Sequence, residues 1–208
     1  MDLKTRWFKL CHLLSLSDNS DIVWGWIEKA YSEKTRYYHN LKHLEDCFNE
    51  LDQTSKSNLE VEFAIWFHDI VYDSQQFYNE ENSAKMSKNA LTLLGCDAKL
   101  IDSINDLILS SKDHKQTLEE NKMLFSDIDL SIFGKDEEVF LKYEENIREE
   151  YGWVPTDIYS KKRIDVLNSF TMRNSIYNLP DFKGKYEKQA RHNITKLVSK
   201  LKDQVYNP

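Results

Sequence analysis

The chain contains few of the residues that make tight turns. Only 5 Gly and 3 Pro occur among its 208 residues, whereas a sandwich or barrel of many strands needs such residues at most of its corners. This depletion favours long helices joined by polar loops. We therefore expect an all-α fold, with one helical domain spanning residues 1–208.

Apolar residues recur at helical spacing through most of the chain. Gly95 and Gly134 follow such stretches, where a left-handed cap would suit glycine, while Asp157 and Asp181 stand where N-caps are expected. A lysine-rich C-terminal helix within residues 181–205 is expected to dock through its apolar face. The predicted helices cover residues 4–15, 20–34, 40–53, 59–70, 79–94, 97–111, 123–132, 136–151, 157–173 and 183–203.

The charge of the chain limits its partners. A formal net charge of -7 and a pI near 5.4 argue against binding to a nucleic-acid duplex, which normally meets a basic surface. The acidic net charge does not exclude a small nucleotide as a ligand, because a bound divalent cation can reverse the local electric field. The start of the chain lacks a signal-peptide pattern, and no run of about 18 apolar residues occurs. We expect a cytoplasmic protein with no membrane partner.

Two histidines lie close together in the segment RYYHNLKH. His39 and His43 are four residues apart, so on one helix they would project from the same face and could reach one ion. An exposed pair on a helix surface is the more common explanation of this spacing. The pair alone therefore does not decide between the two.

The segment EFAIWFHDIVYD is more specific. His68 and Asp69 end an almost wholly apolar helical run, where an ionised carboxylate is costly unless it is paired or coordinated. A metal ion would compensate both side chains. The alternative is a buried Asp that caps a neighbouring helix, with His68 bonded to a carbonyl group.

A second pair of carboxylates interrupts the apolar segment MLFSDIDLSIFG. Asp127 and Asp129 are two residues apart and would point away from each other on a helix, so only one of them is expected to bind the ion. The other would be a helix cap, or a partner that orients a ligating histidine. A set of imidazoles and carboxylates suits one Mn, Fe, Co, Ni, Zn or Mg ion, which could activate water and polarise a phosphoryl group.

Four blocks in this order, RYYHNLKH, WFHDIVYD, NEENSA and DIDLSIFG, resemble the HD superfamily in its branch of predicted metal-dependent phosphohydrolases. The resemblance covers about residues 31–180. It implies an all-α bundle that holds an ion between helices and hydrolyses phosphate esters or anhydrides, commonly in nucleotides. By this match the ligands are His43, His68, Asp69 and Asp129, the last preferred to Asp127 for its Asp-Leu-Ser context.

Several nearby residues are candidates for substrate contact or proton transfer. Glu81 and Asp73 are predicted to act with Asp69 in catalysis, as a general base or by holding the water; an acidic first helical turn would also explain Glu81. The predicted substrate is a small phosphorylated, nucleotide-like molecule, and the residues predicted to contact it are Arg36, His39, His114 and Arg148. Local ion pairs are the alternative for both arginines, and His114 is the one candidate for a second metal.

The resulting hypothesis is a metal-dependent phosphohydrolase. Its alternative is a non-catalytic sensor or interaction protein that binds a nucleotide or a metal in the same pocket. A helical interaction module without metal is a third class. The aromatic content of 12% is compatible with a homodimer face.

Overall fold

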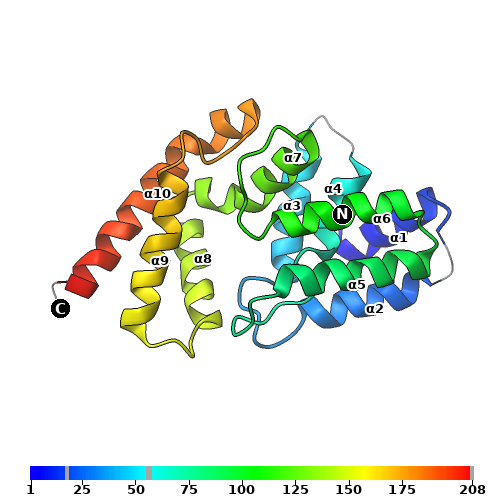
Figure 1. The fold of residues 1–208 in the computed structure, drawn as a ribbon, viewed down its shortest axis with the longest axis horizontal. Helices are drawn as coiled ribbons and strands as arrows, with labels where there is room; N and C mark the ends of the chain where they lie inside the picture. The colour runs from blue at the N-terminus through cyan, green and yellow to red at the C-terminus, as the bar shows by residue number, and fades with distance from the viewer. Residues whose placement is uncertain (17–18, 55–57, 207–208) are drawn as a thin grey trace. The chain divides into compact units, whose positions relative to one another are not determined.

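The computed structural model describes residues 1–16, 19–54 and 58–206, which form ten α-helices, one 3₁₀ helix and no β-strand (Figure 1). The all-α prediction is confirmed. The chain divides into two compact units, Met1–Phe125 and Ser126–Pro208. The elements are α1 (Leu3–Leu13), α2 (Ser20–Tyr31), α3 (Leu41–Asp52), α4 (Leu59–Phe67), α5 (Asn79–Leu94), α6 (Ala98–Ser110), α7 (Glu120–Asp129), η1 (Leu130–Gly134), α8 (Glu137–Glu150), α9 (Thr156–Thr171) and α10 (Pro180–Tyr206).

The centre of the first unit is α4, which packs against α3, α5 and α6. Its residues Phe63 to Phe67 are fully buried, as expected for a helix that is apolar on all sides. The indole of Trp7 from α1 makes edge-on contacts with three rings of α4. The distances between ring centroids are 6.3 Å to Phe63, 5.5 Å to Trp66 and 6.1 Å to Phe67. Each such buried ring contributes about 1.5–3 kcal/mol of transfer free energy. The end of α4 is therefore held in a dense core.

Asparagine caps fix where α3 and α4 begin. The side-chain oxygen of Asn40 accepts from the Lys42 amide at 2.9 Å, and that of Asn58 accepts from the Val61 amide at 3.0 Å. Such caps replace hydrogen bonds that the first turn of a helix lacks. They set the register of the two helices that carry His43 and His68.

The predicted helix ends are partly correct. Gly95 ends α5 with φ of 84°, as expected for a left-handed cap. The same prediction for Gly134 is wrong, because Gly95 is the one described glycine with positive φ. Gly134 instead lies against Tyr186 of α10, where an added Cβ would be 2.4 Å from the Tyr186 Cβ. Asp157 and Asp181 stand one residue inside their helices, because Thr156 and Pro180 begin them. Pro180 suits a first position, since it has no N–H to leave unbonded.

In the second unit α10 packs along α9 and across η1. Asn193 of α10 is buried and donates to the carbonyl oxygens of Phe133 at 2.9 Å and Lys135 at 2.8 Å. A buried ion pair joins Arg163 of α9 to Glu144 of α8 at 2.6 Å. These polar bonds fix η1, α8 and α9 around an aromatic core.

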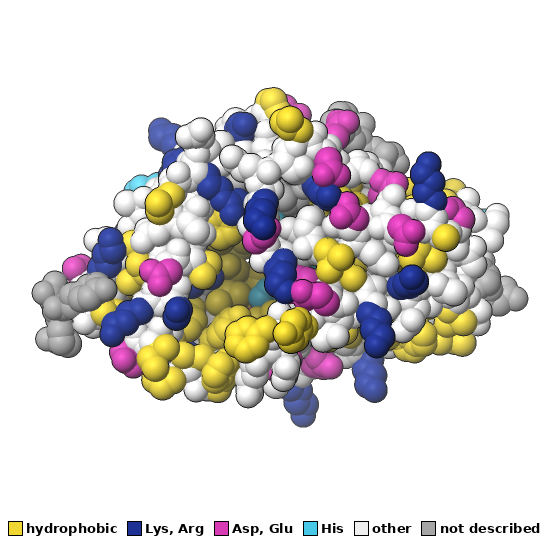
Figure 2. Space-filling model, viewed as in Figure 1, with side chains coloured by type: hydrophobic (Ala, Val, Ile, Leu, Met, Phe, Trp, Pro, Cys, Tyr) yellow, Lys and Arg dark blue, Asp and Glu magenta, His cyan; other side chains and the backbone are white. Residues whose placement is uncertain are grey.

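Charged side chains of both signs are interspersed over the visible face (Figure 2). The lysines Lys196 and Lys200 of α10 are exposed, while Ile194 and Leu197 of the same helix are buried. This confirms the amphipathic pattern expected for the C-terminal helix. Within the described part of the chain, no helix combines the length and the hydropathy that a membrane crossing requires.

Candidate metal centre

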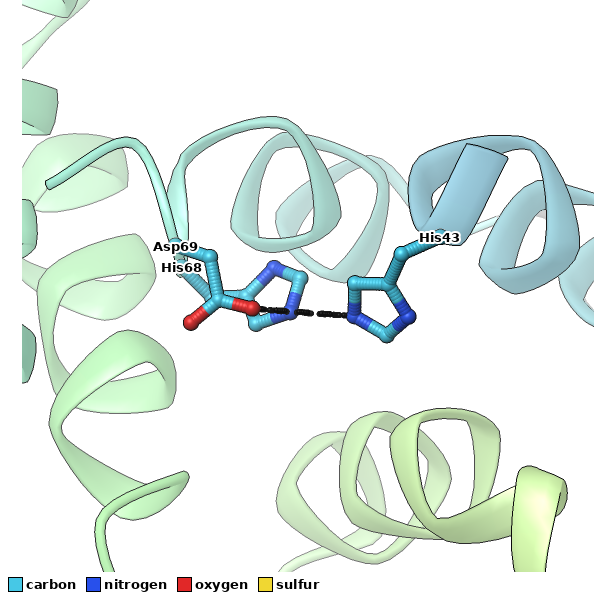
Figure 3. Close-up of side chains that lie close together, drawn as sticks. All are labelled: His43, His68 and Asp69. Carbon is cyan, nitrogen blue, oxygen red and sulfur yellow. Dashed lines mark hydrogen bonds and ion pairs between the residues drawn. The ribbon is translucent and has the colours of Figure 1, made fainter. Parts of the chain in front are cut away.

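His43, His68 and Asp69 converge in the first unit (Figure 3). His43 lies in the first turn of α3, and His68 is the C-cap residue of α4. Adjacent residues of a regular helix diverge. Because α4 ends at Phe67, Asp69 follows after the helix and its carboxylate can turn toward the ring of His68. The two histidines are each 2% exposed, and the Asp69 side chain is 19% exposed.

The three donor atoms are spaced as ligands of one ion would be. His43 Nε2 lies 3.0 Å from His68 Nε2, and Asp69 Oδ2 lies 3.0 Å from His68 Nε2 and 3.6 Å from His43 Nε2. Neighbouring ligands bonded at about 2.0–2.2 Å to one ion lie about 3.0–3.5 Å apart. The group therefore fits a divalent ion in both donor type and spacing.

The main chain orients one of these ligands. His68 Nδ1 lies 3.0 Å from the carbonyl oxygen of Ile65. A carbonyl oxygen only accepts, so Nδ1 carries a proton, and Nε2 is the nitrogen that faces Asp69 and His43 and would bind an ion in its deprotonated form. Metal-ligating histidines are commonly held by a hydrogen bond of this kind.

Asp69 is held as an anion. Burial raises the pKa of its carboxyl group, but His68, His39 and His43 together outweigh burial and keep that pKa below its ordinary value. A carboxylate that is ionised at neutral pH is ready to bind a cation without first losing a proton.

Cys47 is a neighbour of the site that the sequence analysis did not single out. It is 2% exposed, and its Sγ lies 3.7 Å from His43 Nε2. The signal was present in the sequence, since Cys47 follows His43 by four residues and so shares its helix face. The thiol places a soft, polarisable atom beside the donor group.

Arg36 has a different place from the predicted one. Its side chain is 1% exposed, and its guanidinium donates to the carbonyl oxygens of Asp69, of Ile70 at 3.1 Å and of His39 at 3.3 Å. Because these main-chain groups and Glu33 take up its donors, we assign Arg36 to holding the chain around the site rather than to binding substrate.

The other predicted substrate contacts are dispersed. His39 is half-buried and stacks on Tyr72 with ring centroids 4.0 Å apart, close to the ring of His43 at 5.9 Å. His39 thus lies beside the donor group, and its contact with substrate stays a prediction. His114 lies between α6 and α7 with φ of 45°, and among the described residues it belongs to no group of metal donors.

Arg148 belongs to the second unit and closes the end of α8. Its guanidinium donates to the carbonyl oxygens of Tyr151 at 2.6 Å and Val154 at 3.0 Å, and lies 4.6 Å from the ring of Tyr159. These contacts stabilise the turn that leads into α9. They supply a local role for Arg148, and its contact with phosphate stays a prediction.

The two predicted bases have local partners. Glu81 is 43% exposed and paired with Lys112, whose hydrogen bond lowers the pKa of the Glu81 carboxyl. Asp73 is exposed, and its Oδ1 accepts from the Gln75 amide at 2.9 Å. Neither belongs to a donor group among the described residues, so their part in catalysis stays a prediction.

Asp127 caps a helix in the second unit. Its carboxylate is fully buried and accepts from the amides of Asn178 at 2.7 Å and Leu179 at 2.7 Å, just before α10, and from the Asn178 side chain at 3.0 Å. Both oxygens are thereby engaged, which supports the helix cap among the roles expected for Asp127. Asp129 is the last residue of α7 and belongs to the second unit. Its role as a ligand stays a prediction.

The chain matches no protein-family model, no curated protein and no solved structure. Membership of the HD superfamily therefore stays a prediction from the four sequence blocks. The assignment of the site depends on the donor atoms themselves.

Proposed function

We propose that this protein is a metal-dependent phosphohydrolase acting on a small phosphate ester or nucleotide. One observation carries the proposal: two imidazole nitrogens and one carboxylate oxygen converge within 3.6 Å of one another, and the Ile65 carbonyl fixes the tautomer of His68. His43, His68 and Asp69 would hold the ion, with Asp129 as the predicted fourth ligand. The ordered sequence blocks support the choice of reaction.

The mixture of nitrogen and oxygen donors suits Mn, Fe, Co, Ni, Zn or Mg. When bound, such an ion polarises a phosphoryl oxygen and lowers the pKa of a coordinated water. The chain contributes the orientation of His68, the negative charge of Asp69, and the aromatic wall of His39 and Tyr72 beside the donor group.

Hydrolysis of p-nitrophenyl phosphate and of a nucleotide panel, with each of these ions added in turn, tests the proposal. We expect turnover with at least one ion. Asp69→Asn should reduce turnover by more than about a hundredfold, because it removes an anionic ligand. Asp46→Asn is the matched control, since Asp46 lies on α3 near His43 but is exposed and paired with Lys42. Circular dichroism checks that both variants are folded.

The same protein preparation separates the alternatives. Ion binding that raises the melting temperature without any turnover would make the protein a sensor and refute the proposed activity. If elemental analysis finds no bound metal and added ions cause no thermal shift, the protein would be a helical interaction module. Full activity in Asp69→Asn would show that this cluster is not the reaction centre.

A further inference from the structure

A buried arginine holds the chain at the point where the donor group is built. The main chain at Asp69 and Ile70 follows the end of α4 and has no helical hydrogen bonds for its carbonyl oxygens. Both of these carbonyls accept from Arg36, at 3.1 Å in the case of Ile70. A guanidinium presents several donors in a rigid plane, so it can hold two successive carbonyls at once.

Other side chains complete this arrangement. The Tyr31 hydroxyl accepts from the Asp69 amide at 3.2 Å, and the Ser83 hydroxyl accepts from the Val71 amide at 3.1 Å. The Arg36 guanidinium also lies 5.2 Å from the Tyr31 ring. The main chain from Asp69 to Val71 is thus bonded on every side although it is not part of a helix.

The cost of burying Arg36 indicates that this arrangement is specific. Its side chain is 1% exposed, whereas its carboxylate partner Glu33, at 2.9 Å, is 49% exposed. A buried charge with one half-exposed counter-ion depends on its remaining hydrogen bonds. Those bonds go to the carbonyls of Asp69, which belongs to the donor group, of Ile70, which follows it, and of His39.

We propose that Arg36 is a positioning residue, which orients the Asp69 carboxylate toward His43 and His68 by fixing the main chain at Asp69 and Ile70. The inference about metal affinity rests on the proposed function. The inference about the main chain does not, because it concerns contacts within the protein alone.

The chain offers a matched control in Arg6. Its side chain is 12% exposed, and it pairs with Glu62 of α4 at 2.7 Å and Asp52 of α3 at 2.8 Å. Arg6 therefore joins the same two helices as the donor group, but at the opposite end of each. Both Arg6→Lys and Arg36→Lys keep the positive charge and lose the planar fork of donors. The first does so far from the donor group, and the second does so beside it.

Amide hydrogen exchange, measured by NMR without added metal, is the first readout. Arg36→Lys should speed exchange at Asp69, Ile70 and Val71 by tenfold or more, and Arg6→Lys should leave these amides within about twofold of the wild type. Unchanged exchange in Arg36→Lys would overturn the proposal. If that variant does not fold, Glu33→Gln replaces it, since Glu33 is half-exposed and bonds the guanidinium. The same amides should then exchange at least threefold faster. Unchanged exchange rates in Glu33→Gln would likewise overturn the proposal.

Calorimetric titration with Zn²⁺ and with Mn²⁺ is the second readout. We expect the dissociation constant to rise tenfold to a hundredfold in Arg36→Lys, as is typical when a residue that orients a ligand is lost. In Arg6→Lys the dissociation constant should rise by less than threefold. Faster exchange with unchanged affinity would show that Arg36 does not orient Asp69. A wild-type protein that binds neither ion would refute the proposed function, while the exchange rates would still decide whether Arg36 fixes the main chain.

Discussion

Asp127 shows how a carboxylate can be placed for folding although it stands two residues from a predicted ligand. The sequence could not separate Asp127 from Asp129 by residue type, because both interrupt one apolar segment. Its partners, the amides of Asn178 and Leu179, lie about fifty residues further along the chain and leave no local sequence pattern. The family resemblance favoured Asp129 as ligand, and the hydrogen bonds now give Asp127 a function of its own.

The titration of Asp127 gives a prediction about stability. Burial raises the pKa of its carboxyl group to about 6, above the value of about 3.9 for an unfolded Asp. The protonated form is thus favoured in the folded state, so this contribution to stability is complete below about pH 4 and is lost as the pH rises through about 6. We expect Asp127 to lower the free energy of unfolding by about 3 kcal/mol over this window.

Urea unfolding of the wild type and of Asp127→Asn at pH 4.5 and 7.0 measures the effect. The amide of the variant does not titrate, so the difference in stability between the two proteins should depend on pH, with the wild type relatively more stable at the lower pH. Parallel pH profiles of the two proteins would contradict the prediction.

Arg36 and Cys47 have places in the site that were not predicted from the sequence, for two different reasons. The role of Arg36 depends on carbonyl groups at Asp69 and Ile70, which carry no signal in the side-chain sequence. Cys47, by contrast, could have been found from its spacing to His43. His68 and Asp69 were predictable because a charge and an imidazole at the end of an apolar helix need compensation, whereas His43 was assigned by the family resemblance.

Local sequence signals predicted well which segments form helices, and less well the residues at which those helices begin and end. Gly95 was identified correctly because its cap depends on its own φ angle. Gly134 was not, because its reason to be glycine is the approach of α10, an element about fifty residues later. A contact between distant elements is absent from any local window of sequence.

This close approach predicts opposite effects for two glycines. Gly134→Ala would place a Cβ 2.4 Å from the Tyr186 Cβ and 2.9 Å from its Cα, so we expect destabilisation by about 1–3 kcal/mol from overpacking. Gly184→Ala is the control, because nothing lies within 4 Å of the added Cβ and alanine favours a helix by about 0.8–1.0 kcal/mol over glycine. Thermal unfolding should lower the melting temperature of the first variant and raise that of the second. Equal shifts would show that η1 and α10 are not in close contact.

For the protein as a whole, the composition predicted the fold class because scarce turn residues leave few alternatives to helices. It could not predict the reaction, because donor atoms are compatible with several chemistries. The net charge of -7 is the difference between 28 basic and 35 acidic residues, and the two signs are interspersed on the face that Figure 2 shows. We therefore expect ion binding to be governed by the donor group and not by a general acidic field.

Ion binding should stabilise the protein by an amount that grows with the logarithm of the ion concentration above the dissociation constant. A divalent ion at about 100 times its dissociation constant contributes about 2.7 kcal/mol when it binds the folded state alone. For a chain of this length that corresponds to a rise of about 5–10 °C in melting temperature. Differential scanning calorimetry with and without a chelator measures the rise. It should vanish in Asp69→Asn and persist in Asp46→Asn; a rise retained in Asp69→Asn would place the bound ion elsewhere.

The burial of α4 also provides an optical reporter. Trp66 is fully buried, meets Trp7 at 5.5 Å and Trp24 at 6.2 Å, and stands two residues before His68. Because these three rings share the core around α4, the tryptophan emission of the protein should change when this core loosens on unfolding. The native fluorescence of the protein would thus report the stability of the helix that leads into His68, with no label and no substrate.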